Sequence, residues 1–204
     1  MNTTKKTKSP FFAEVIESSL YGWKAQSWEW NFSPSFGSLV TLEANNRIWF
    51  GIVYQSATGS SDPARHPYAY QKTSGELMAE QPQIFNFLQT TFECVTVGFS
   101  EHEKIIYQIA PEPPKIHTFV QYATTEQART FFASPLYLSI LFQATHISHL
   151  DELLLAIMWN QHKMGLLHED KITASLEHLS LLTGNDYRRI KLFMQRLEAN
   201  NLIH

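Results

Sequence analysis

The chain has 204 residues, of which 44% are hydrophobic and 17% charged, and its formal net charge is −3. This composition is typical of a folded globular protein and excludes an intrinsically disordered chain. The negative charge gives no overall attraction to nucleic-acid phosphates, so a nucleic-acid site would need a local basic patch. The single cysteine, Cys94, excludes a disulfide within the chain and favours a reducing, cytoplasmic location.

The start of the chain is predicted to be a disordered arm covering residues 1–9. It is basic, with Lys5, Lys6 and Lys8, and Glu14 follows before any sustained apolar segment, unlike a signal peptide. The most apolar later segment, 131–142, is shorter than the roughly 20 residues that a transmembrane helix needs. We therefore expect no membrane contact.

The N-terminal half is predicted to be a small antiparallel β-barrel covering residues 10–122. Short apolar or alternating segments separated by turn residues indicate strands at 11–17, 23–30, 38–43, 47–55, 92–99, 102–109 and 116–122. Asn45 and Asn46 suit the positive φ angles of a tight hairpin. Pro82 predicts a short helix over 82–91 that lies outside the barrel or closes its end.

The C-terminal half is predicted to be an all-helical bundle covering residues 125–204, because the hydrophobic period becomes that of a helix. Its last three helices are expected at 150–162, 171–183 and 187–199. Ser148, Asp170 and either Asn185 or Asp186 are the predicted N-caps. The fold class is therefore α+β, a small antiparallel β-barrel followed by a helical bundle.

Three segments of the barrel half carry a resemblance to a known family. Residues 13–18, 34–40 and 49–54 each read as a strand with one glycine or small residue at a bend. They resemble the HAS-barrel of HerA-type translocases and of the catalytic subunits of rotary ATP synthases. With residues 61–67, 81–85 and 97–99, the chain is similar to stand-alone HAS-barrel proteins of cyanobacteria. The resemblance implies an assembly or docking role on an ATPase-type partner.

The sequence departs from the ATPases in the residues that bind nucleotide. Their barrel precedes a phosphate-binding loop of the form Gly-x-x-x-x-Gly-Lys-Ser/Thr. None of the eight glycines here is followed by lysine. The resemblance therefore carries over no nucleotide hydrolysis and no nucleotide cofactor.

No catalytic, cofactor or metal site is predicted. Cys94 has no base near it in sequence and is expected to be a buried structural thiol. His146 and His149, followed by Asp151 and Glu152, could hold a metal, but polar residues at the start of a helix explain the same pattern. The sequence contains no His-Glu-x-x-His, no paired Cys-x-x-Cys and no Gly-x-Ser-x-Gly motif. We expect a protein that is not an enzyme.

The turn-rich segment 58–68 is a candidate binding loop because it is long and carries Asp62 and Arg65. The pair could bind a charged group of a partner or a ligand. Alternatively, Asp62 caps the turn and Arg65 closes it by a salt bridge. A second group, Trp23, Trp28, Trp30 and Trp49, is expected to pack in the core, with base stacking as the alternative.

The last two helices have the spacing of a helix-turn-helix, which would place Arg188, Arg189, Lys191 and Arg196 in a DNA groove. Facing Ile190, Phe193, Met194 and Leu197 inward leaves Leu192 on the opposite face, between Arg188 and Arg196. An apolar residue inside a polar rim favours a protein contact. Docking of this helix on the barrel or on a partner protein would bury Leu192, and a helix free to enter a DNA groove would leave it exposed in the unbound protein.

These patterns predict a non-enzymatic protein-interaction or assembly module. The predicted partner-binding residues are Asp62, Arg65, Arg188, Leu192 and Arg196. The alternative is a nucleic-acid-binding regulator that uses the last two helices.

Overall fold

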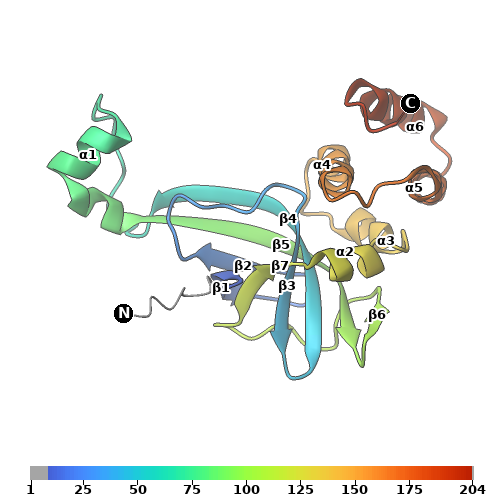
Figure 1. Cartoon of the computed structure of the whole chain (residues 1–204), viewed down its shortest axis with the longest axis horizontal. Helices are drawn as coiled ribbons and strands as arrows, with labels where there is room; N and C mark the ends of the chain where they lie inside the picture. The colour runs from blue at the N-terminus through green and yellow to red at the C-terminus, as the bar shows by residue number, and fades with distance from the viewer. Residues whose placement is uncertain (1–8, 204) are drawn as a thin grey trace, which may run out of the picture.

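The computed structural model describes residues 9–203 and confirms the α+β fold, a closed antiparallel β-barrel followed by helices (Figure 1). Residues 1–8 of the predicted disordered arm lie outside the described residues. The strands are β1 Phe11–Ser18, β2 Gly22–Ser27, β3 Leu39–Ala44, β4 Arg47–Ser60, β5 Leu88–Glu101, β6 Lys104–Ile106 and β7 Phe119–Tyr122. Their order is β2-β1-β7-β3-β4-β5-β6, and pairing of β2 with β5 closes the barrel and leaves β6 as an extra strand on β5.

Residues with positive φ angles form the hairpin turns, and they also make two strands shorter than predicted. Asn45 and Asn46, with φ of 52° and 59°, form the predicted turn between β3 and β4. The expected strand 102–109 shrinks to β6 because His102 and Glu103 form the turn after β5, with φ of 49° and 65°. The expected strand 116–122 shrinks to β7, because His117 at φ 68° interrupts the extended backbone.

The barrel interior is filled by inward-facing apolar side chains of its strands. The fully or nearly buried members include Val15, Ala25, Val40, Leu42, Val53, Phe92, Cys94 and Val120. Trp23 and Trp49 also lie in this core, as predicted for the tryptophan group. Trp28 is half exposed, and Trp30 is partly buried against the ring of Phe85.

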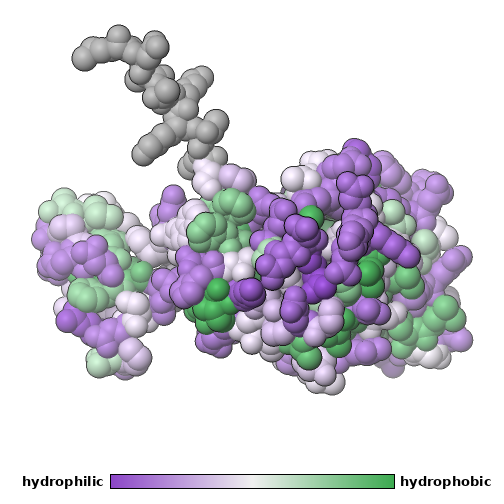
Figure 2. Space-filling model, turned by 90° about the horizontal axis from the view of Figure 1, so that it is seen from below, coloured by the Kyte–Doolittle hydropathy of each residue, from purple (hydrophilic) through white to green (hydrophobic). Residues whose placement is uncertain are grey.

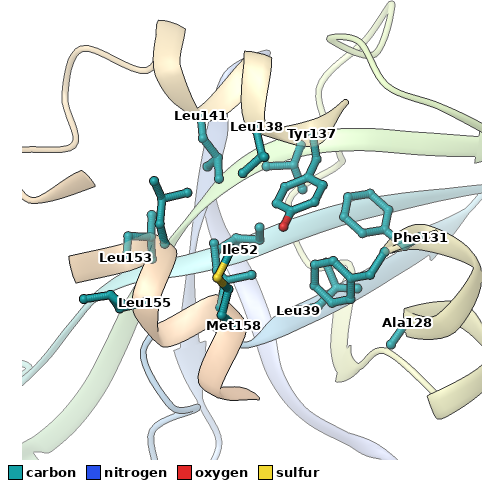
Figure 3. Packing of buried hydrophobic residues seen from close by; sticks show 14 of the residues in the cluster. Leu39, Ile52, Ala128, Phe131, Tyr137, Leu138, Leu141, Leu153, Leu155 and Met158 are labelled. Carbon is teal, nitrogen blue, oxygen red and sulfur yellow. The ribbon is translucent and has the colours of Figure 1, made fainter. Parts of the chain in front are cut away.

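A second core joins the outer wall of the barrel to the helices α2 Thr125–Phe131, α3 Tyr137–Gln143, α4 Leu150–Lys163, α5 Glu169–Leu182 and α6 Tyr187–Ala199. Figure 3 shows Leu39 and Ile52 of the barrel meeting side chains of α2, α3 and α4, among them Phe131 and Met158. Burial of apolar surface at this junction stabilises both parts together. None of the helices within residues 9–203 is long and apolar enough to span a membrane.

The helix caps agree only in part with the predicted ones. Asp186 caps α6, because its side chain accepts a hydrogen bond from the backbone N–H of Arg189 at 3.1 Å. The predictions of Ser148 and Asp170 as caps were wrong, since His149 and His168 occupy the N-cap positions of α4 and α5 without a side-chain hydrogen bond. Asp170 lies instead in the first turn of α5, where a carboxylate interacts favourably with the helix dipole.

The paired strands β4 and β5 continue past the barrel and carry a segment that the sequence did not predict. Their pairing runs as far as Ser60 and Leu88, and the connection holds helix α1, Ser74–Glu80, and the 3-10 helix η1, Pro82–Phe87. The predicted helix 82–91 therefore ends early, and the predicted loop 58–68 starts inside β4. We call residues 57–89 the projecting arm, which points away from the rest of the molecule (Figure 1).

Candidate functional site

Asp62 and Arg65 lie in a turn of the projecting arm and contact each other. The Arg65 Nε atom is 3.3 Å from Asp62 Oδ2, and Asp62 Oδ1 accepts a hydrogen bond from the backbone N–H of Ala64 at 2.9 Å. The Arg65 guanidinium lies 4.0 Å from the ring centre of Phe87. The structure thus shows the predicted alternative in which Asp62 caps the turn and Arg65 closes it by a salt bridge. Both side chains stay exposed, and an exposed ion pair contributes little stability, so a partner can still reach them.

The projecting arm is held together by hydrogen bonds and a few ring contacts. Thr58 and Thr90 hydroxyls lie 2.7 Å apart, and the backbone N–H of Ser61 donates to the Phe87 carbonyl at 2.7 Å. Helix α1 starts with a capping box between Thr73 and Glu76, and these hydrogen bonds lower the pKa of Glu76. These local hydrogen bonds hold the arm in its conformation, although the arm has no buried core of its own.

Large apolar side chains of the arm are exposed. Tyr68 is 69% exposed and Met78 49%, and neither α1 nor η1 contains a buried residue. Figure 2 shows hydrophobic residues on the surface of the lobe at the left, which is the arm. The arm therefore offers apolar surface that nothing in the described chain covers.

The last helix, α6, packs on α4 and α5 and leaves Leu192 exposed. Its buried residues are Phe193 and Leu197, which were predicted to face inward. Met194 was predicted to be buried with them, but it is 37% exposed. Leu192 is 54% exposed, so within residues 9–203 this face of α6 is not docked on the rest of the protein, and an outside partner or DNA stays open as its contact.

Two of the four basic residues of α6 form ion pairs with carboxylates of α4. Arg189 donates to Asp151 of α4, with Nη2 at 2.6 Å from Oδ1, and Arg196 Nη1 lies 2.7 Å from Glu152 Oε1. The hydrogen bond with Arg196 lowers the pKa of Glu152. If α6 entered a DNA groove, two of the four basic residues expected to face it would first have to leave these ion pairs with α4. Within residues 9–203, Arg188 and Lys191 form no ion pair.

The structure separates the five predicted partner-binding residues into two surfaces. Arg188, Leu192 and Arg196 line one hollow of about 610 Å³ on α6. Asp62 and Arg65 lie on the projecting arm, at the other end of the molecule (Figure 1). No single site contains all five.

Exposure of Leu192 leads to a direct test. We expect Leu192→Ala to change the free energy of unfolding by less than about 0.5 kcal/mol, since an exposed side chain loses few contacts. The matched substitution Leu197→Ala, at a fully buried position of the same helix, should cost about 2–5 kcal/mol. Urea denaturation of both variants measures this difference. Similar losses for the two would mean that Leu192 is buried.

Cys94 is a buried thiol inside the barrel, as expected. Only 1% of it is exposed, and burial, together with the neighbouring Glu93, raises its pKa well above the ordinary value. A thiol in such a site stays protonated near neutral pH and is a poor nucleophile.

We therefore expect Cys94 to react with a disulfide reagent such as DTNB at least about 100-fold more slowly in the folded protein than in urea, because reaction requires opening of the barrel. Absorbance at neutral pH measures both rates, with glutathione as the exposed-thiol control. Equal rates in the folded and unfolded states would contradict a closed barrel around Cys94.

The histidine cluster suggested as a metal site is dispersed. Asp151 and Glu152 bind arginines of α6, and the ring of His146 lies 5.2 Å from that of Tyr54. The part of the chain that the structure describes has no group of three or more His, Cys, Asp or Glu residues placed to hold a metal ion.

A serine and a histidine that the sequence pattern does not connect lie side by side in the structure. Ser139 Oγ of α3 lies 2.8 Å from His178 Nε2 of α5. Residues so far apart in sequence give no local motif. Among residues 9–203 no carboxylate bonds to His178, so the third member of a hydrolase triad is missing. The hydrogen bond between Ser139 and His178 links α3 to α5.

The sequence matches no protein-family model and is not significantly similar to any curated protein. Membership of the HAS-barrel family therefore stays a prediction. A small closed barrel alone does not establish it, because such architectures serve many unrelated functions.

Proposed function

We propose that the protein is a non-enzymatic protein-interaction module that docks on a partner protein through the projecting arm. One observation carries the proposal: no residue from 54 to 89 is buried, although this stretch contains α1, η1 and the outer end of the β4–β5 hairpin. A segment of this kind normally needs apolar burial to offset the entropy of ordering its backbone and side chains.

A partner surface would supply the burial that the arm lacks. Covering Tyr68 and Met78 removes two large apolar side chains from water, and exposed apolar surface rimmed by polar groups is typical of protein contacts. The arm also carries oppositely charged side chains, since Asp62 pairs with Arg65 and Lys72 with Glu80. We therefore expect a partner surface with an apolar centre and polar edges.

The two hydrophobic cores of the molecule are built without the arm. Neither hydrophobic core contains a residue from 57–89. An element that projects from a stable body without contributing to its core is suited to contact another molecule. The resemblance to the HAS-barrel makes an ATPase-type protein the first partner to test, by analogy alone. The hollow on α6, with Arg188, Leu192 and Arg196, would be a second contact.

Nucleic-acid binding through α6 is the second candidate function. Exposed Arg188 and Lys191 favour it, but the ion pairs of Arg189 and Arg196 with α4 remove two of the four expected phosphate contacts. Binding to duplex DNA that weakens steeply with salt, and that Arg188→Ala with Lys191→Ala abolishes, would support it. No binding at low salt would exclude it.

Shortening the arm tests the proposed function. Replacing residues 61–87 by Asn-Gly connects Ser60 to Leu88 through a two-residue turn, which suits these two residues because they pair with each other across the hairpin. We expect this variant to fold with an unchanged core and to lose the partner protein that the full chain captures from an extract of its own cells. Mass spectrometry of the captured proteins measures the loss.

The control for this experiment is Arg188→Ala with Leu192→Ala, which alters the α6 surface and leaves the arm intact. Retention of the same partner by the shortened protein, with loss in the α6 variant, would transfer the docking role to α6 and overturn the proposal. Thermal melts of both variants confirm that they are folded.

A further inference from the structure

A large hollow lies where the barrel meets the helices. It has a volume of about 930 Å³. On one side lie β5 and residues 107–109, which follow β6, and on the other lie α3 and residues 144–146, which follow it. Small-molecule sites typically have volumes of about 300–1,000 Å³ and often lie between two packed parts of a protein. The hollow is therefore large enough for a small organic molecule.

The lining of this hollow contains no aspartate, glutamate, lysine or arginine. Val95, Ile109 and Ile140 supply apolar surface, and Gln108, Ser139 and Gln143 supply amide and hydroxyl groups. The charged side chains nearby, Glu17, Lys24 and Glu93, line a separate hollow of about 310 Å³. Tyr21 and His146 line both hollows and mark the boundary between them.

We propose that the larger hollow, which we call the junction site, binds an uncharged small molecule with an apolar body and one or two hydrogen-bonding groups. Apart from His146 at the boundary, the lining offers an ionised ligand no acidic or basic side chain, so such a ligand would lose hydration without an ion pair in return, which is unfavourable. An uncharged ligand loses much less and gains apolar contact with Ile109 and Ile140.

The polar groups of the junction site define how the ligand is oriented. Ser139 Oγ hydrogen-bonds to His178 Nε2 at 2.8 Å, and a hydroxyl with one such bond can still make another. The amides of Gln108 and Gln143 both donate and accept. A ligand hydroxyl or carbonyl bonded to these residues would touch the barrel and α3 at once, so its binding stabilises their junction. This site is independent of the projecting arm.

The probe for this proposal is Nile red, an uncharged dye whose fluorescence shifts to the blue in apolar surroundings. We expect saturable binding to one site. Ile140→Trp should weaken the affinity at least about tenfold, because the indole fills the hollow. Gln143→Trp, at the exposed rim, should also weaken the affinity for Nile red, and it should disturb folding less because the side chain there is exposed. Leu181→Trp, at a position that is 72% exposed, is the matched control and should leave the affinity unchanged.

Three results would overturn the proposal. They are the absence of saturable Nile red binding, binding that both Ile140→Trp and Gln143→Trp leave unchanged, and equally tight binding of the anionic dye ANS that the same variants abolish. The last result would place a ligand in the junction site but contradict its uncharged class. The protein with the shortened arm should still bind Nile red, whether or not it binds the partner protein. Measuring both kinds of binding on this variant therefore tests the junction site separately from the proposed function.

Discussion

Replacing Phe131 by alanine is expected to lower the free energy of unfolding by about 3–5 kcal/mol, among the largest effects of a single substitution in this chain. The side chain is fully buried, and its ring stacks on Phe50 of β4 with 4.8 Å between ring centres. The rings of Tyr107 and Tyr137 lie 5.4 and 5.5 Å away. Because these neighbours come from both the barrel and the helices, the cavity would weaken the junction that holds the two together.

Urea denaturation followed by circular dichroism measures this loss. Leu181→Ala, which truncates a side chain that is 72% exposed, is the control and should stay within about 0.5 kcal/mol of the unaltered protein. A loss below about 1 kcal/mol for Phe131→Ala would contradict a common core between the barrel and the helices.

Gly37→Ala is expected to destabilise the protein by about 2–5 kcal/mol through two separate effects. The residue has φ of +75°, and a left-handed backbone costs roughly 1–2 kcal/mol for a residue with a Cβ atom. That Cβ would also lie 2.8 Å from the backbone of Ala156 and Ile157 in α4, and overpacking of this kind costs about 1–3 kcal/mol. The close approach of Gly37 to α4 is thus part of the junction between barrel and helices.

Gly59→Ala provides the comparison, since a Cβ at that position meets no atom within 4 Å. Thermal and urea denaturation of the two variants should place Gly37→Ala well below the unaltered protein and Gly59→Ala close to it. Equal stability of both variants would show that α4 does not approach the barrel at Gly37.

The barrel was predictable because its strands obey local rules. Inward-facing apolar residues alternate along them, and Asn45 and Asn46 adopt the left-handed conformation that their type favours. The projecting arm was not predictable in the same way. Its strands are exposed on both faces, so no alternation reveals their length, and α1 has no buried face to give a helical period. Only the capping box of Thr73 and Glu76 signals this helix.

The candidate sites were predictable where contacts are local. Asp62 and Arg65 are three residues apart, and their ion pair was one of the two stated alternatives. Arg189 and Asp151 are 38 residues apart, so no spacing in the sequence could show that α4 neutralises this arginine. The junction site combines residues from Tyr21 to His146 and has no motif. Sequence patterns could not reveal it, because tertiary packing alone creates it.

Site-specific photo-crosslinking tests most directly whether the projecting arm is the docking element. The photoreactive amino acid p-benzoylphenylalanine is placed at Met78 on the arm or, as a control, at Leu181 on α5, both exposed positions at opposite ends of the molecule. After irradiation of cells that contain these proteins, we predict one discrete protein adduct from Met78 and none of that mass from Leu181. An adduct from Leu181 with none from Met78 would contradict docking through the arm.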